Sequence, residues 1–210
     1  QRYPQLMSMT ALEPFKQRLA GNLSGGMKQK LGLACTLVRS PDLLLLDEPT
    51  VGVDPLSRRE LWEIIHHLVE EQKLTVLMST AYLDEAERCH HALVLHHGKV
   101  LASGKPQEVA ALANGKTFLL DPPSQQSARV YQAQLLDDPH VIDAVPDGGR
   151  VRVVVGDEQV SSFDRNQATS TAARFEDGFM VLLRRTEQQQ AGELKLAQPI
   201  QANGGEAAVQ

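Results

Sequence analysis

Two short stretches constrain the fold of this chain more than any other part of it. Residues 23–27, Leu-Ser-Gly-Gly-Met, are typical of a glycine loop that opens a helix. Residues 43–48, Leu-Leu-Leu-Leu-Asp-Glu, are typical of a buried strand that ends in two carboxylates. The N–H groups at a helix start and the helix dipole favour a bound phosphate, and acids at the carboxyl end of a parallel strand lie where open α/β sheets bind ligands. Together they predict an α/β fold with nucleotide and Mg²⁺ chemistry.

These stretches resemble motifs of the ATP-binding cassette (ABC) family, in the export-type subfamily of transporter ATP-binding subunits. Residues 23–27 match the signature motif, residues 43–48 match Walker B, and residues 51–54 match the D-loop. Residues 82–89 are similar to the helix that follows the switch histidine, and the match runs over residues 19–109, roughly half the chain. The resemblance implies the C-terminal part of a nucleotide-binding domain, and it leaves open that the chain is one half of a tandem subunit.

Periodicity and turn residues predict the elements of this part of the chain. Asp54 can cap a helix that has Pro55 at its first position and an apolar face that ends at Val69. The other predicted helices are at 24–38, 82–89 and 106–112, and the predicted strands are at 43–47, 74–78, 92–95 and 99–102.

The rest of the chain changes character. Strands are predicted at 117–120 and 150–155, a helix at 128–136 and a turn at 147–149. We therefore expect a partial P-loop NTPase (ABC-type) domain in residues 1–110 and a small α+β accessory region in residues 111–185. That region resembles an appendage of many export-type subunits, and Phe175–Phe179 is similar to the segment that usually closes them. Residues 186–210 are rich in Gln, Ala, Gly and Glu, which predicts a linker or disordered tail.

The composition excludes some classes of protein. A net charge of −5 over 210 residues gives no indication of a nucleic-acid-binding surface. No apolar stretch approaches the roughly 20 residues of a membrane span. The two cysteines, Cys35 and Cys89, are expected to be reduced thiols in a cytosolic protein. We expect Cys35 to pack in the core, on the side of the signature helix that carries Ala34 and Val38.

The resemblance implies roles for the acids that end the Walker B strand. Asp47 would hold Mg²⁺, a cation that prefers carboxylate and water oxygens. Glu48 would be the catalytic residue that orients or deprotonates the attacking water. The alternative, that both residues are ordinary acids at the end of a strand, is disfavoured by the signature motif in the same chain.

In the family, the signature residues bind the nucleotide of a facing domain rather than their own. Ser24, Gly25 and Gly26 would therefore close over a γ-phosphate held by a second nucleotide-binding domain, and Asp54 would line the same interface. The alternatives are a plain glycine turn before a helix and, for Asp54, a simple helix cap.

One departure from the family is the missing phosphate loop, G-x-x-x-x-G-K-[ST] between a strand and a helix. Residues 21–28 nearly fit it but have Met27 where Lys is required. Residues 110–117 fit a loosened pattern, but a predicted helix precedes them and a predicted strand follows, so we expect this match to be accidental. The isolated chain is therefore expected to bind ATP poorly and to be inactive.

The second departure is Ala81, which stands where the family has the switch histidine. A methyl group cannot donate a hydrogen bond to phosphate, so we expect a slow or inactive site and an asymmetric pair of sites in the complete protein. The histidine pairs at 66–67, 90–91 and 96–97 are not expected to bind metal, because adjacent helical residues point apart.

The functional expectation is an ATP-binding subunit that couples ATP and Mg²⁺ to export through a separate membrane permease. The expected location is the cytoplasm, on the inner face of the cell membrane. A catalytically degenerate regulatory half, which supplies only the signature motif to a partner site, is the alternative. A soluble ABC protein acting on DNA or ribosomes is disfavoured, since long coiled-coil insertions and basic arms are absent from the sequence.

Overall fold

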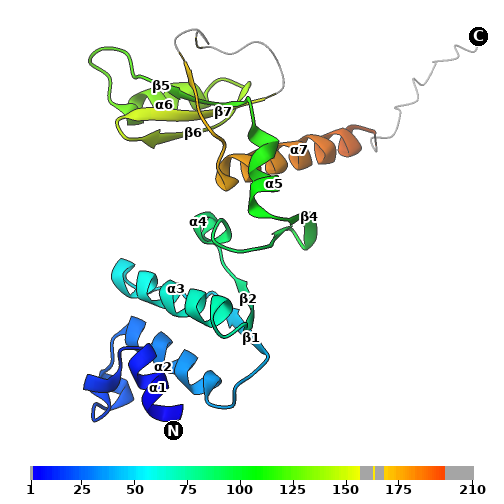
Figure 1. The fold of residues 1–210 in the computed structure, drawn as a ribbon. Helices are drawn as coiled ribbons and strands as arrows, with labels where there is room; N and C mark the ends of the chain where they lie inside the picture. Colours follow the sequence, from blue (N-terminus) through cyan, green and yellow to red (C-terminus); the bar gives the residue numbers. More distant parts are fainter. Residues whose placement is uncertain (1, 157–162, 164–167, 197–210) are drawn as a thin grey trace, which may run out of the picture. The chain divides into compact units, whose positions relative to one another are not determined.

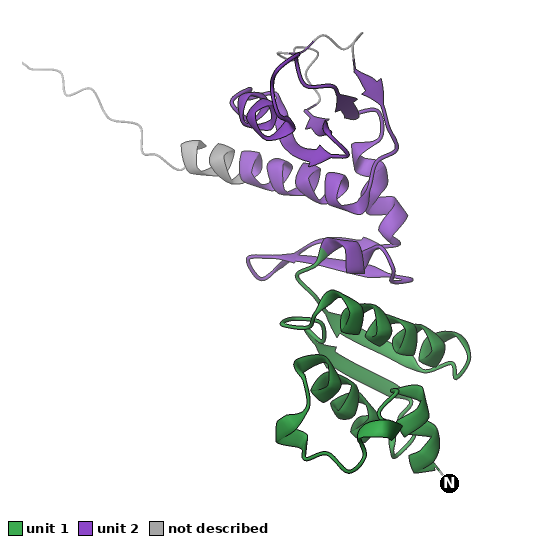
Figure 2. Ribbon diagram, turned by 90° about the vertical axis from the view of Figure 1, so that its left-hand side faces the viewer, with its two compact units in different colours: residues 1–82 green, residues 83–210 purple. Residues whose placement is uncertain are grey.

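The computed structural model describes residues 2–156, 163 and 168–196. The chain divides into two compact units, residues 1–82 and residues 83–210 (Figure 2). Each unit is described below by itself.

Unit 1 combines three helices with a two-stranded parallel sheet (Figure 1). Its elements are α1 (Arg2–Met9), α2 (Gly25–Leu37), β1 (Leu43–Asp47), α3 (Pro55–Glu70) and β2 (Thr75–Ser79), with short 3₁₀ turns at Glu13–Phe15 and Ala20–Asn22. The register of β1 and β2 runs from Leu43 opposite Thr75 to Asp47 opposite Ser79. The predicted signature helix, Walker B strand and helix at Pro55 are confirmed, and the second strand lies one residue later than predicted.

The core of unit 1 lies between the helices and one face of this sheet. It is formed by apolar residues that recur at helical spacing in α2 and α3, together with Leu6 of α1, Leu44 of β1 and Leu74. From α3 these are Leu61, Ile64, Ile65 and Leu68, as the periodicity predicts, and Trp62 of the same helix is also buried.

The prediction of a buried Walker B strand holds for one of its two faces. Leu44 is 3% exposed, whereas Leu45 is 65% exposed and Leu77 of β2 is 64% exposed. Successive side chains of a strand point to opposite faces. The described residues of unit 1 cover only one of those faces.

Cys35 is exposed, which corrects the expectation that it packs in the core. The buried stripe of α2 runs through Lys30, Leu33, Ala34 and Leu37, at the i, i+3, i+4 and i+7 positions of one helix face. Cys35 lies beside that stripe, and Val38 is 59% exposed.

Unit 2 begins with short elements. They are α4 (Leu83–Ala86), the antiparallel hairpin β3 (Ala92–His96) and β4 (Lys99–Gly104), α5 (Pro106–Ala110) and a 3₁₀ turn at Ala111–Ala113. The hairpin is confirmed, and its turn has φ of 47° at His97 and 73° at Gly98. The predicted helix at 82–89 is shorter in the structure.

The second part of unit 2 is a four-stranded antiparallel sheet of order β6-β7-β5-β8 with two helices (Figure 1). Its elements are β5 (Thr117–Leu120), α6 (Ala128–Leu136), β6 (Val141–Asp147), β7 (Arg150–Val155), β8 (Thr169–Ser170) and α7 (Phe175–Leu196). Strands β5 and β7, helix α6 and the turn at 147–149 are confirmed. The sequence did not predict β6, β8 or α7.

Helix α7 joins the two parts of unit 2. Its Phe175 is buried with Val94 and Val109, and its Val181 is buried with Ala113 and Val154 of β7. A side chain at Gly178 would place its Cβ 1.9 Å from the Val109 carbonyl oxygen, so only glycine fits there. The helix extends to Leu196, which differs from the linker or tail predicted from residue 186. Ala, Leu, Glu and Gln, which are common in this stretch, have high helix propensity.

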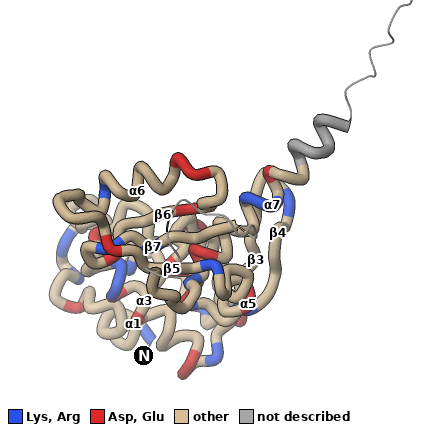
Figure 3. The backbone as a smooth tube through the Cα atoms, turned by 90° about the horizontal axis from the view of Figure 1, so that it is seen from above, with Lys and Arg blue, Asp and Glu red and all other residues tan. Residues whose placement is uncertain are grey.

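Acidic and basic residues are interspersed along the described backbone (Figure 3). Among the described residues, no helix has the length and apolar character needed to cross a membrane.

Candidate functional site

The two acids of the Walker B stretch lie where β1 ends. Both side chains are exposed, and Ser79 lies opposite Asp47 in the parallel register. The Ser79 hydroxyl donates to Asp47 Oδ1 (2.5 Å) and accepts from the Glu48 N–H (3.0 Å). Sequence reasoning did not single out Ser79. No signal within either segment identifies it, because its bonds depend on the register of β1 with β2.

The signature stretch forms the start of α2. Ser24 is the N-cap, and its Oγ accepts from the Met27 N–H at 3.2 Å. Ser24 and Gly25 are exposed, and the first N–H groups of the helix have no acceptor within it. This end of α2 could therefore bind an anion.

Gly26 is buried, and the structure shows a packing role for it. A Cβ at Gly26 would lie 2.3 Å from the Ser57 Cβ of α3. A Cβ at Gly25 would lie 3.5 Å from the Gly52 carbonyl oxygen. The structure thus brings the signature glycines next to the D-loop and the first turn of α3.

Asp54 caps α3, as predicted. Its Oδ1 accepts from the Leu56 N–H (3.1 Å) and the Ser57 N–H (3.0 Å). The Ser57 N–H stabilises the carboxylate and lowers the pKa of Asp54 below its ordinary value. Asp54 is thus held as an anion at the positive end of the helix.

Ala81 is exposed in the turn after β2. The Thr80 hydroxyl accepts from the Tyr82 N–H (3.1 Å), and the Arg58 guanidinium lies 4.4 Å from the centre of the Tyr82 ring. The turn is therefore fixed on both sides of position 81, but Ala81 offers only a methyl group.

The donor set fits Mg²⁺ in its chemistry. The Asp47 carboxylate and the Ser79 hydroxyl lie together where β1 and β2 end, the exposed acid Glu48 follows directly in the chain, and such hard oxygens are the ligands that Mg²⁺ prefers. The match at residues 110–117 contains the 3₁₀ turn Ala111–Ala113 and ends at Thr117, the first residue of β5, whose hydroxyl donates to the Ala113 carbonyl. A loop in that order does not present N–H groups from a helix start.

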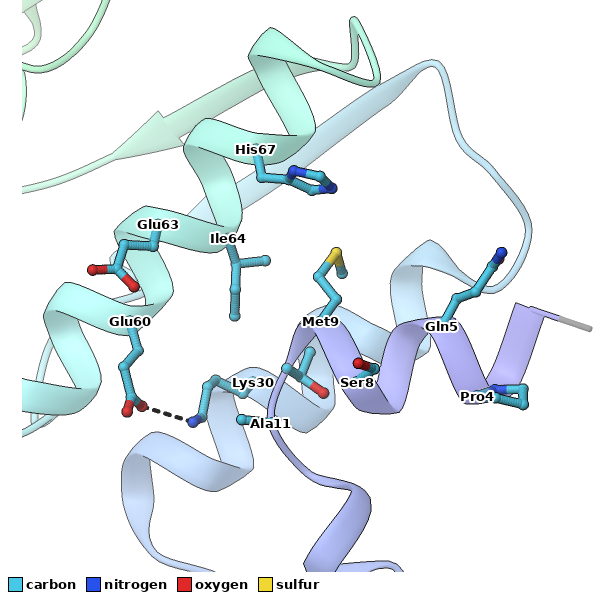
Figure 4. Close-up of a pocket in the computed structure, with 11 residues that line it drawn as sticks. Pro4, Gln5, Ser8, Met9, Ala11, Lys30, Glu60, Glu63, Ile64 and His67 are labelled. Carbon is cyan, nitrogen blue, oxygen red and sulfur yellow. Dashed lines mark hydrogen bonds and ion pairs between the residues drawn. The ribbon is translucent and has the colours of Figure 1, made fainter.

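A separate pocket lies between α1, α2 and α3 (Figure 4). Lys30, only 6% exposed, crosses one side of it and pairs with Glu60 at 2.8 Å. None of the residues that line this pocket belongs to the predicted site.

The histidines make local contacts. His91 Nε2 lies 3.0 Å from the Ser103 hydroxyl, and His67 lies 3.1 Å from Glu71. Among the described residues, no group of three or more His, Cys, Asp or Glu is arranged to hold a metal ion.

Comparison with known proteins gives consistent matches. The family model described as ABC transporter matches residues 1–51. The probable multidrug ABC transporter ATP-binding protein YbhF of Escherichia coli (strain K12) is 45% identical over 190 residues, which cover 87% of this chain and 32% of YbhF. The Nod factor export ATP-binding protein I of Cupriavidus metallidurans is 41% identical over 110 residues, 52% of this chain and 36% of that protein.

Among solved structures, cbiO1 from Clostridium perfringens, part of the ABC transporter complex cbiONQ, aligns with a TM-score of 0.49. It is 32% identical over 52% of this chain and 44% of its own.

The chain belongs to the ATP-binding proteins of ABC transporters. Within them it groups with the exporter-type relatives YbhF and Nod factor export protein I. It spans about a third of the length of these curated relatives. The alignment with YbhF covers 190 residues, so it extends beyond residues 19–109, the range over which the sequence motifs indicate the resemblance.

Proposed function

We propose that this chain is the signature- and Walker B-bearing part of an ATP-binding subunit of an ABC exporter. In the complete protein, ATP binding and hydrolysis at an interface between two nucleotide-binding domains would drive export through an integral membrane permease. The observation that carries the proposal is the pair of adjacent, exposed carboxylates at the carboxyl end of β1. The subunit would act in the cytoplasm, on the inner face of the cell membrane.

The residues have separate roles in this proposal. Asp47 would hold Mg²⁺, which supplies charge neutralisation on the phosphates when it is bound. Glu48 would orient the attacking water and accept its proton. Ser24, Gly25 and Gly26 would contact the nucleotide of the facing domain, and Asp54 would line the interface beside them.

The test is ATP hydrolysis by the full-length protein with Glu48→Gln. We expect turnover to fall about 100-fold or more, because a positioned base is lost while the shape is kept. The matched control is Asp42→Asn, an exposed acid just before β1, which should keep wild-type turnover. Equal rates for Glu48→Gln and wild type would refute the catalytic role.

A second measurement concerns the 210-residue chain alone. Because it has no phosphate loop, we expect calorimetry to detect no binding of Mg-ATP. Micromolar binding would mean that residues 110–117 or another segment bind phosphate. It would overturn the proposal that this chain carries only the signature and Walker B part of the site.

A catalytically degenerate regulatory half is the alternative, and Ala81 is the observation that favours it. Replacing Ala81 by His in the full-length protein should raise ATPase activity if this site is slow because the donor is absent. The gain expected from one preorganised donor is on the order of 100-fold at that site. Unchanged activity would argue against an asymmetric pair of sites.

A further inference from the structure

Ser79 contacts both acids of the Walker B stretch at once. Its hydroxyl donates its proton to Asp47 Oδ1 (2.5 Å) and accepts from the Glu48 N–H (3.0 Å). The Ser79 carbonyl oxygen accepts from the same N–H at 3.2 Å. The hydroxyl of Ser79 thus contacts both Asp47 and Glu48, and its carbonyl oxygen contacts Glu48 as well.

Glu48 has a backbone conformation that needs such support. Its φ is +43°, in the left-handed region that residues other than glycine rarely adopt. Conformations of this kind persist only where surrounding contacts determine them. The described contacts of the Glu48 N–H both come from Ser79, so Ser79 fixes the turn from which the Glu48 side chain projects.

The bond to Asp47 restricts the carboxylate in a second way. A serine hydroxyl has one proton, and here it goes to Oδ1. Oδ2 takes no hydrogen bond from Ser79, so Ser79 does not compete with a cation for its lone pairs, and rotation of the carboxylate would break the bond to Oδ1. Residues that hold a metal ligand in orientation often matter nearly as much as the ligand itself.

We propose that Ser79 is a positioning residue, which sets the orientation of Asp47 toward the metal and of Glu48 toward the attacking water. This inference rests on the proposed function. It adds a residue that sequence motifs did not single out, and its hydroxyl is the part of it that a substitution can remove while the backbone contact stays.

The experiment compares Ser79→Ala, Ser79→Thr and a control in the full-length protein. Ser79→Thr keeps the hydroxyl, and Thr75→Val removes a hydroxyl from the opposite end of the same strand. Two quantities are measured: the dissociation constant of Mn²⁺ in the presence of ATP, by electron paramagnetic resonance, and the kcat and KM of Mg-ATP hydrolysis.

We expect Ser79→Ala to weaken Mn²⁺ binding about 10-fold or more and to lower kcat by a similar factor, with KM for ATP nearly unchanged. Ser79→Thr should restore both quantities, and Thr75→Val should match wild type. A merely structural role would lower the amount of folded protein without separating kcat from KM.

Amide hydrogen exchange of Glu48 in the 210-residue chain gives a readout that needs no turnover. Ser79→Ala should speed exchange at the Glu48 N–H, and Ser79→Thr should not. Wild-type metal affinity and kcat in Ser79→Ala would overturn the inference. If Glu48→Gln keeps full activity while Ser79→Ala still weakens Mn²⁺ binding, the proposed hydrolytic role fails and the positioning of Asp47 stands.

Discussion

Arg152 of β7 and Asp177 of α7 form a buried ion pair, with 2.6 Å between Arg152 Nη2 and Asp177 Oδ2 and with side chains only 6% and 5% exposed. Arg152 Nε donates to both carboxylate oxygens of Asp177. Asp177 Oδ2 also accepts from the Arg174 N–H at 2.7 Å. One carboxylate therefore joins the sheet of unit 2 to the first turn of α7.

Replacing Arg152 by Met should destabilise unit 2 by about 3–5 kcal/mol, because it leaves the Asp177 carboxylate buried without its cation. Hydrogen exchange of the β7 and α7 amides measures this loss within unit 2. The control is Arg184→Met, which removes an exposed guanidinium that donates to the Pro139 carbonyl, and which should cost less than about 1 kcal/mol. Equal costs for the two variants would contradict the role assigned to the pair.

Gly178→Ala should destabilise α7 although alanine is the better helix former. The added Cβ would meet the Val109 carbonyl oxygen at 1.9 Å, so the helix must move away from α5. We expect a loss of about 1–3 kcal/mol, measured by thermal unfolding. Gly32→Ala in α2 is the matched control, because its Cβ meets nothing within 4 Å and should stabilise by up to about 1 kcal/mol. A stabilising Gly178→Ala would show that the contact with Val109 is not tight.

Gly26→Ala tests the packing role of this glycine apart from its proposed contact with a nucleotide. The new Cβ would collide with Ser57, and we expect unit 1 to lose about 1–3 kcal/mol. Trp62 is the chain's single tryptophan and lies in unit 1, so its fluorescence follows unfolding of that unit.

Two further variants complete this test. Gly25→Ala makes only an ordinary contact at 3.5 Å and should be nearly neutral for stability. Adding Ser57→Gly to Gly26→Ala should recover stability in a double-mutant cycle. If it recovers stability but not the ATPase activity of the full-length protein, Gly26 also serves the phosphate. No recovery would mean that Ser57 is not the cause.

Asp143 should make unit 2 less stable as the pH rises. Burial raises the pKa of Asp143, and the charge of Asp177 raises it further, while the Ala144 N–H opposes them. Because the folded state binds this proton more tightly than the unfolded state, ionisation of Asp143 lowers the free energy of unfolding. This destabilisation is fully present above the pKa of the folded state and disappears below the pKa of the unfolded state, about 3.9. Asp143→Asn should therefore raise the melting temperature by a few degrees at pH 7, with the gain shrinking toward pH 4.

The control for this pH dependence is Asp121→Asn, an exposed acid just after β5. It should change stability by less than about 0.5 kcal/mol at either pH. A lower melting temperature for Asp143→Asn at pH 7 would show that its carboxylate is stabilising.

Local chemistry explains why part of this fold could be predicted. Ser24 and Asp54 are residue types that accept from the free N–H groups of a helix start, and both do so here. The apolar spacing of α3 predicts its buried face correctly. The acids Asp47 and Glu48 close an apolar run of strand length, so their position at the end of a strand is predictable from that segment.

The features that were missed depend on what lies opposite each residue. The apolar run of β1 has the same sequence whether one face is covered or two, so the exposure of Leu45 could not be predicted. Strand β6 carries Asp143 and Pro146, which interrupt the pattern of a buried strand. The bonds of Ser79 require the register of β1 with β2, and a pattern within one segment does not contain it.

The acceptor for the Phe175 N–H at the start of α7 is Glu87, which lies 88 residues earlier and contributes its Oε1 at 2.6 Å. Contacts of such sequence separation form late, because a long loop must close before they can be made. During synthesis, the hairpin β3–β4 and helix α5 emerge well before the helix that covers Val94 and Val109. A chain cut anywhere between residues 114 and 174 would leave those apolar side chains open to other molecules. Unit 2 is therefore a structure that helix α7 completes, and the ribosome must deliver the chain through this helix before the hairpin β3–β4 and α5 are covered.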